Sequence, residues 1–290
     1  MRRDTRLGIW LMILAVTCFA IQDGFSRHLA ETYNVFMIVM VRYWVFAAFV
    51  IAWALRRKGG LRSVATPQPL LHVARASLLI AEVCVIIWGY TLIGLIESHA
   101  VFAVCPLLIA ALSGPMLGER LGLRGWLAIL AGLVGVIIIL QPGFGVFSPA
   151  ALLPLAAASM FALYSVLTRK ASARDSSFNS LFWSGTIGAI IITAIGLPQW
   201  EQMTPLDWGM TAIYALLALA ANYILIKCYE TAEASVVQPF AYLQIVLVSI
   251  IGVVVYQETL ETHVIVGAAI IIAAGLVTLA TTRSVKIDAG

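Results

Sequence analysis

Three ionisable side chains lie deep inside long apolar segments of the chain. Asp23 and Glu82 are carboxylates in two such segments, and Arg42 is a guanidinium in a third. Glu82 stands about 11 residues into its segment, which is roughly 16 Å along a helix and close to the middle of a bilayer. Charged groups at that depth are costly and usually face a cavity or a partner. These residues therefore indicate solute binding or proton transfer.

Each of these charges also has a structural explanation. Asp23 and Arg27 are four residues apart, so they would share a helix face and could form an ion pair at a helix end. Glu82 and Arg42 could neutralise each other across two helices. The residues alone leave both roles open for both carboxylates.

Further candidates are neutral or titrate near neutral pH. His99 stands at the mouth of an apolar segment and is either a titrating group or a solvated loop histidine. Tyr242 and Gln244 are two residues apart and cannot fully share one helix face. Aromatic side chains in such segments serve packing as readily as binding. The full set of predicted binding residues is Asp23, Arg42, Glu82, His99, Tyr164, Asn222, Tyr223, Tyr242 and Gln244.

Motifs for catalysis and for cofactor binding are missing from the sequence. It contains no Gly-rich phosphate loop, no nucleophile elbow and no HExxH motif. The four histidines are scattered, and the four cysteines all lie within apolar runs without CxxC spacing. We therefore predict no catalytic residue, no cofactor and no metal.

The elements that must position these residues are membrane-spanning helices. Hydrophobic residues make up 62% of the 290 residues and charged residues 11%, against about 45–50% and about 25% in soluble domains. The first apolar run lacks a small-residue cleavage site and is followed by others, so we interpret it as a span. The sequence predicts an all-α membrane protein with ten spans, at 7–27, 35–55, 71–93, 99–117, 124–141, 150–168, 178–197, 208–229, 235–256 and 263–282.

The distribution of Lys and Arg predicts the orientation of these spans. Sixteen of the eighteen basic residues fall at the two termini or in the loops on the same side of the membrane as the termini. The positive-inside rule then places both termini in the cytoplasm, with the chain in the inner membrane. The net charge of +4 is explained by topology, so the bilayer is a predicted partner and nucleic acid is not.

The two halves of the chain echo each other. We predict a five-helix repeat over residues 1–145 and a second over 146–290. Because five is an odd number, the two repeats enter the membrane in opposite senses, an architecture known in secondary transporters. We interpret Glu119 and Glu258 as caps or ion-pair partners of nearby helix termini. The echoes are Tyr90 with Tyr229, Glu119 with Glu258, Leu121 with Leu260, Phe19 with Phe161, Arg27 with Arg169 and Gly135 with Gly275.

The segment PLLIAALSGPMLGERLGLRGWLAILAGLVGVIII, which begins at Pro106, resembles the signature of the drug/metabolite transporter superfamily, in particular its EamA-type members. The second half departs from this pattern at Ile245, which stands in the position of Pro106, and at Tyr256-Gln257. The resemblance implies a cavity lined by spans 1, 3, 4, 6, 8 and 9, with spans 5 and 10 at the periphery. It also implies transport of small organic solutes such as amino acids, nucleotide-like metabolites or drugs.

The resulting functional hypothesis is a secondary carrier that works by alternating access. With carboxylates and neutral donors at membrane depth, we expect a small zwitterionic or cationic, amino-acid-like metabolite and, from the resemblance, export. Uptake of a larger cationic metabolite such as S-adenosylmethionine is the alternative, as is a scaffold that transports nothing. An enzyme would have to use Asp23, Glu82 and His99 as its only acids and bases. We expect a monomer or a homodimer.

Overall fold

The computed structural model describes residues 5–117, 122–140, 149–171, 174–231 and 240–287. These residues form helices and connecting turns, which confirms the all-α membrane fold. The helices are α1 (Thr5–Thr32), α2 (Val35–Arg56), α3 (Pro69–Ile93), α4 (Leu95–Phe102), α5 (Cys105–Leu117), α6 (Leu123–Leu140), α7 (Leu152–Ala171), α8 (Ser177–Gly196), α9 (Pro205–Thr231), α11 (Leu243–Tyr256) and α12 (Thr262–Ile287), with short 3₁₀ turns η1 (Gly60–Val64), η2 (Pro149–Ala151) and η3 (Leu197–Gln199).

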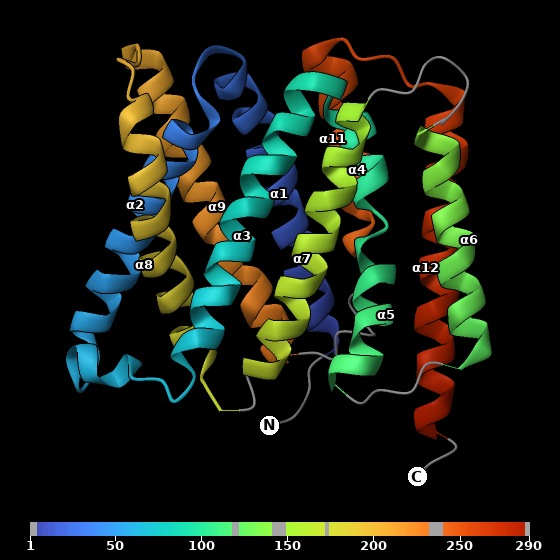
Figure 1. Cartoon of the computed structure of the whole chain (residues 1–290), viewed down its shortest axis with the longest axis horizontal. Coiled ribbons are helices and arrows are strands. Elements are labelled where there is room, and N and C mark those ends of the chain that lie inside the picture. Colours follow the sequence, from blue (N-terminus) through green and yellow to red (C-terminus); the bar gives the residue numbers. More distant parts are fainter. Residues whose placement is uncertain (1–4, 118–121, 141–148, 172–173, 232–239, 288–290) are drawn as a thin grey trace.

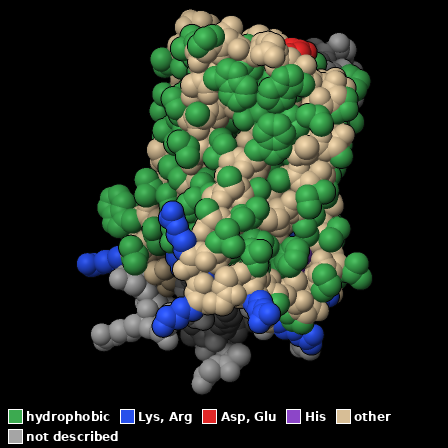
Figure 2. All heavy atoms as spheres, turned by 90° about the vertical axis from the view of Figure 1, so that its left-hand side faces the viewer, with side chains coloured by type: hydrophobic (Ala, Val, Ile, Leu, Met, Phe, Trp, Pro, Cys, Tyr) green, Lys and Arg blue, Asp and Glu red, His purple; other side chains and the backbone are tan. Residues whose placement is uncertain are grey.

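Ten apolar segments have the length or composition of membrane helices. Seven are long enough to cross a bilayer, and three shorter ones run over 125–140, 243–256 and 262–277. Large apolar side chains such as Trp10, Leu70 and Ile190 are exposed on the outside of the bundle. Figure 2 shows hydrophobic side chains over much of one face. Such a surface is suited to lipid and not to water. The predicted boundary at residue 145 lies outside the described residues, as does Glu119.

The predicted fourth span is two helices and not one. α4 ends at Phe102 and α5 begins at Cys105, with a turn at Ala103 and Val104 between them. Pro106 lacks an N–H, so it cannot continue the hydrogen bonds of α4 into α5. The spacing that aligns Glu119 with Glu258 places Tyr242 at the position of Ala103, and Tyr242 is also a turn residue, directly before α11. Helix breaks at membrane depth are tolerated where they line a cavity.

Two helix pairs form opposite sides of the bundle. α6 packs against α12 at one side, and α2 and α8 lie at the other (Figure 1). Gly135 of α6 and Gly267 of α12 allow the close crossing, because a Cβ on Gly135 would lie 2.7 Å from the Gly267 carbonyl oxygen. α6 and α12 are spans 5 and 10, which the family resemblance placed at the periphery.

The two ends of the bundle differ in charge. α1 begins and α12 ends at the same end (Figure 1). On the face shown in Figure 2, Lys and Arg side chains gather at that end, and an acidic side chain is visible at the other. We refer to these as the basic end and the acidic end.

A buried polar cluster joins α3, α7 and α8 near the basic end. Asp175 accepts hydrogen bonds from Thr66 Oγ1 at 2.8 Å and Gln68 Nε2 at 3.0 Å, and lies 3.1 Å from His72 Nε2. Arg75 Nη1 lies 2.9 Å from His72 Nδ1. Since the guanidinium can only donate, Nδ1 accepts and Nε2 carries the hydrogen that reaches Asp175. Burial raises the pKa of Asp175, but the hydrogen bonds from Thr66, His72 and Gln68 outweigh it and hold the pKa below its usual 3.8.

Candidate functional site

A central cavity of about 170 Å³ lies between the two halves of the chain. Its walls come from α1, α3, α4, α5, α7, α9 and α11, together with the turn residues beside α11. These are spans 1, 3, 4, 6, 8 and 9, the set that the family resemblance led us to expect, and span 2 adds one side chain, Arg42. Both helix breaks line the cavity, through Ala103 and Tyr242.

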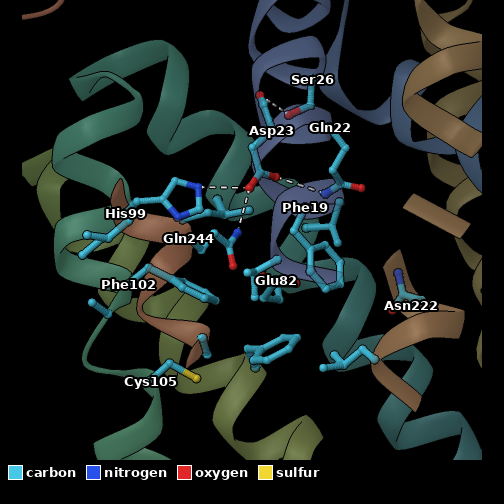
Figure 3. Close-up of a pocket in the computed structure, with 18 of the residues that line it drawn as sticks. Phe19, Gln22, Asp23, Ser26, Glu82, His99, Phe102, Cys105, Asn222 and Gln244 are labelled. Carbon is cyan, nitrogen blue, oxygen red and sulfur yellow. Dashed lines mark hydrogen bonds and ion pairs between the residues drawn. The ribbon is translucent and has the colours of Figure 1, made fainter. Parts of the chain in front are cut away.

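Asp23 is the centre of a hydrogen-bonded cluster in this cavity (Figure 3). Its carboxylate accepts from Gln22 Nε2 and from Gln244 Nε2, each at 3.0 Å. His99 Nε2 lies 3.1 Å from the same carboxylate and 2.9 Å from the Tyr90 hydroxyl. The cluster therefore joins α1, α3, α4 and α11, and it combines residues from both halves of the chain.

The structure differs from two of the alternatives that the sequence left open for these residues. Asp23 forms no ion pair with Arg27 among the described residues, because Arg27 pairs with Glu31 and Glu258 instead. His99 is not a solvated loop residue, since only 5% of it is exposed and it contacts Asp23.

Glu82 lies in the same cavity and is 6% exposed. Within the described ranges its carboxylate has no hydrogen bond and no ion pair, and the predicted pair with Arg42 is absent. The reason is that Arg42 has aromatic partners: its Nη1 donates to the Tyr214 hydroxyl at 3.0 Å, and its guanidinium lies over the rings of Tyr214 and Tyr43. Glu82 is thus a buried carboxylate that lines the cavity without a direct partner, although it lies close enough to Arg42 for an attractive electrostatic interaction.

Some buried cavity atoms also lack partners. Arg42 Nε and Gln22 Oε1 belong to residues that line the cavity, and both atoms are buried and make no hydrogen bond within the part of the chain that the structure describes. The Tyr242 hydroxyl also lacks a hydrogen bond there, but it lies against Gly275 of α12. Buried polar atoms are normally paired, so one donor and one acceptor on cavity-lining residues have no protein partner.

Seven of the nine predicted binding residues line the central cavity, and Tyr164 and Tyr223 do not. Asn222 lines it from α9, where its Nδ2 also donates to the Ala218 carbonyl at 2.8 Å. Tyr164 instead lies under the guanidinium of Arg75, 5.3 Å from its ring centroid. Tyr223 packs against Trp53, with ring centroids 5.5 Å apart, in a second cavity.

Sequence reasoning missed four side chains with clear roles in this cavity. Tyr90 and Tyr214 are phenols in the middle of apolar runs, the same signal that identified Tyr242. Phe19 and Phe161 both line the cavity and are equivalent in the two repeats. Their equivalence was visible in the sequence and could have marked them as a symmetric pair.

A second cluster closes the bundle near its acidic end. The Glu258 carboxylate accepts from the backbone N–H groups of Leu95 at 2.7 Å and Ile96 at 2.8 Å, and it pairs with Arg27. Gly94 has φ of +91°, and a Cβ there would lie 2.9 Å from Glu258 Oε1. The prediction that Glu258 caps a helix terminus is confirmed, because it satisfies the first N–H groups of α4.

Tyr256 extends this cluster to α1. The Arg27 guanidinium lies over its ring, 4.1 Å from the centroid, and its hydroxyl donates to the Gly24 carbonyl at 2.6 Å. We call Arg27, Tyr256 and Glu258 the latch, because together they hold α1, α4 and α11 side by side.

Comparison with known proteins identifies the family of this chain. Residues 6–141 and 148–280 match the EamA-like transporter family. The S-adenosylmethionine uptake transporter of Rickettsia prowazekii is 24% identical over 275 residues, which cover 93% of this chain and 91% of that protein. The riboflavin transporter of Vibrio cholerae is 27% identical over 269 residues, covering 91% and 90%.

One further relative is named for a third solute, and one solved structure is similar in fold. The pseudopaline exporter CntI of Pseudomonas aeruginosa is 22% identical over 271 residues, covering 92% of this chain and 94% of that protein. A solved crystal structure with 20% sequence identity has a TM-score of 0.67 and covers 96% of this chain and 98% of its own. These relatives thus include an uptake transporter and an exporter, and the three are named for different small molecules.

Proposed function

Because the chain belongs to the EamA-like transporter family of the drug/metabolite transporter superfamily, we propose that it is a secondary carrier for a small zwitterionic or cationic metabolite. That it is a small-molecule transporter of the membrane, and not an enzyme, follows from the family and from its relatives. The nature of the solute and the direction of transport are our proposal.

The unpaired Glu82 carboxylate is the observation that carries this proposal. A carboxylate in a buried cavity needs a cation or a proton. A solute ammonium group at Glu82 would supply that charge. Arg42, which lines the cavity and whose Nε is a buried donor without a partner, would then receive a solute carboxylate. An amino-acid-like zwitterion matches Glu82 and Arg42 together.

The size of the cavity supports a small solute. Its volume of about 170 Å³ is below the roughly 300–1,000 Å³ of pockets for drug-sized ligands. The alternative, uptake of a larger cation such as S-adenosylmethionine, is supported by the similarity to the Rickettsia prowazekii transporter. Phe19, Phe102 and Phe161 in the cavity wall could stack on the aromatic part of such a solute.

We further propose export by alternating access across the inner membrane, with both termini in the cytoplasm and with repeats over 1–145 and 146–290. The latch would close the acidic end in one state and would open in the other. The helix breaks at Ala103 and Tyr242 lie where the cavity wall would have to bend. The structure holds no energy-coupling domain within the described residues, so gradients would drive transport.

A binding screen with matched solutes tests the proposal. Purified protein is heated with an amino acid, its methyl ester, its N-acetyl derivative and S-adenosylmethionine. A bound ligand at 100 times its Kd stabilises the folded state by about 2.7 kcal/mol. We expect stabilisation by the free amino acid, a smaller effect of the ester, and none by the N-acetyl compound, because that compound lacks the ammonium group.

Substitutions test whether Glu82 is the carboxylate that binds the ammonium group of the solute. Glu82→Gln should remove stabilisation by the amino acid and by the ester. Glu97→Gln is the matched control, because Glu97 is on α4 but does not line the cavity. Equal stabilisation by the N-acetyl compound, or full stabilisation of Glu82→Gln, would refute the proposed solute class. Stabilisation by S-adenosylmethionine alone would favour the alternative.

A further inference from the structure

A second cavity of about 150 Å³ lies between α2, α8 and α9 and shares no lining residue with the central one. It is formed where α2 ends, where α8 begins and near the last turns of α9. Its walls include Trp53, Arg57, Ser177, Phe178, Tyr223 and Lys227. No carboxylate is among the described side chains that line it. This cavity contains Tyr223, one of the two predicted binding residues that do not line the central cavity.

Arg57 is held against the aromatic wall of this cavity. Its guanidinium lies 4.0 Å from the ring centroid of Phe178 and 5.9 Å from that of Trp53. Contact with aromatic rings restrains a guanidinium, while its N–H groups can still donate hydrogen bonds. Across the described residues, the guanidinium N–H groups of Arg57 have no hydrogen bond and no ion pair. A restrained guanidinium with free N–H groups is suited to two-point binding of a phosphate.

A second cation and a helix terminus contribute further positive potential. The Lys227 ammonium lies 6.0 Å from the ring centroid of Tyr223, which in turn packs against Trp53. Ser177 and Phe178 are the first residues of α8, whose N-terminus carries a partial positive charge. An anion in the cavity would therefore interact favourably with α2, α8 and α9.

The surroundings of the cavity are basic toward one end of the bundle and apolar above it (Figure 2). It lies toward the basic end, on the side of the bundle formed by α2 and α8, where Figure 2 shows Lys and Arg side chains below an apolar surface. Phe49 of α2 is exposed and packs against Trp53 of the cavity wall, with ring centroids 5.5 Å apart. Basic pockets between membrane helices bind phosphate-bearing headgroups.

We propose that this second cavity binds the phosphate group of an anion, with Arg57 as the two-point donor and Lys227 as the second charge. The anion is an anionic phospholipid or a free phosphate. The site is separate from the cavity that holds the transported solute, so it does not depend on the proposed solute.

Native mass spectrometry of the delipidated full-length protein in neutral detergent tests whether the second cavity binds a phosphate group. The probes are phosphatidylglycerol, phosphatidylcholine and inorganic phosphate. A lipid site predicts that phosphatidylglycerol binds at least about tenfold more tightly than phosphatidylcholine, because only the former has a net negative headgroup. A free-phosphate site predicts binding of inorganic phosphate, with no gain from the acyl chains.

Substitutions locate the binding. Arg57→Gln should lower the affinity for the probe that the wild type binds best by about tenfold. Arg57→Lys should lower this affinity by less, since lysine keeps the charge but not the two-point geometry. Arg62→Gln is the control, because Arg62 is exposed at the same end and does not line the cavity. Retained solubility and elution volume show that each variant is folded.

The proposal is overturned if phosphatidylglycerol and phosphatidylcholine bind equally and inorganic phosphate does not bind. It is also overturned if Arg62→Gln weakens binding as much as Arg57→Gln.

Discussion

At the scale of residues, the acidic, basic and histidine side chains that line the central cavity in the described part of the chain come from its first half. Asp23, Arg42, Glu82 and His99 precede residue 146, whereas Tyr214, Asn222, Tyr242 and Gln244 are neutral. The spacing that aligns Tyr90 with Tyr229 places Ala221 at the position of Glu82. The two repeats are therefore similar in fold and different in chemistry, and a charged solute would be held mainly by the first repeat.

The hydrogen bond between Arg42 and Tyr214 gives a prediction on stability. Tyr214→Phe removes the only acceptor within hydrogen-bond distance of Arg42 Nη1 among the described residues. A buried charged donor without a partner costs about 1–3 kcal/mol, so the free energy of unfolding should fall by that amount. Denaturant or thermal unfolding in detergent measures the change.

Tyr43→Phe is the matched control for that substitution. The Tyr43 hydroxyl is buried and has no hydrogen-bond partner in the described part of the chain. Its removal should leave stability unchanged or slightly increased. Equal destabilisation by both variants would show that loss of a hydroxyl, and not loss of the Arg42 partner, is responsible.

The depth of a polar residue in its span could be predicted from the sequence, but its direction could not. Depth identified Asp23, Glu82, Asn222 and Gln244 as cavity residues. Tyr164 and Tyr223 lie at similar depths but face other helices. In a soluble helix, the polar face indicates the direction of each side chain. In a membrane helix, lipid-facing and buried positions are both apolar, so the rotation of the helix is not visible in the pattern.

At the scale of elements, the latch depends on one carboxylate that caps α4. Glu258→Gln removes the ion pair with Arg27 and weakens the cap on Leu95 and Ile96. Loss of a cap and of a charge-assisted hydrogen bond costs about 1–3 kcal/mol. We expect a lower melting temperature in detergent and, in cells, faster labelling from the outside of a cysteine introduced at Ser26.

Glu31→Gln is the control for Glu258→Gln, because it also removes an ion-pair partner of Arg27 but leaves the cap on α4 intact. Glu31 also pairs with Arg27, but its side chain is 46% exposed. Exposed ion pairs contribute only about 0–1 kcal/mol, so this variant should melt and label like the wild type. If Glu258→Gln also behaves like the wild type, the latch does not hold the acidic end closed.

The cluster around Asp175 predicts a pH dependence at the basic end. The pKa of Asp175 is lowered in the folded state, so its contribution to stability is present above the unfolded value of 3.8 and is lost as the pH falls through the lower folded value. The difference in melting temperature between the wild type and Asp175→Asn should therefore be full at pH 7 and should shrink below pH 3.8. Glu201→Gln, at an exposed loop position, should show no such trend. A difference that stays constant down to pH 3 would contradict the prediction.

Spans were easier to predict than their interruptions. Hydropathy located each of the ten segments, because a bilayer requires long apolar runs. It did not show that span 4 is divided at Ala103 and Val104, because the residues on both sides of the break are apolar. Pro106 was the local signal for this break, and no proline marks the equivalent position near Tyr242.

At the scale of the whole molecule, the topology is directly testable. Gln199 and Asp207 lie near Asn34 and Tyr33, between α1 and α2, and so at the end of the bundle opposite the start of α1. With cytoplasmic termini, tags at either terminus should be inaccessible in intact cells, and a tag between Pro198 and Asp207 should be reachable. An accessible N-terminus together with an inaccessible 198–207 loop would invert the topology.

The central claim is that Glu82 binds the positive charge of a transported metabolite, and flux into proteoliposomes tests it most directly. Labelled amino acids are exchanged against unlabelled pools with wild-type, Glu82→Gln and Glu97→Gln protein reconstituted in equal amounts. Removing one partner of a buried charge contact costs about 2–5 kcal/mol, so exchange by Glu82→Gln should fall by at least tenfold while folding is retained. Glu97→Gln should exchange like the wild type. The account would be contradicted if the wild type exchanges amino acids or organic cations and Glu82→Gln exchanges them at the same rate.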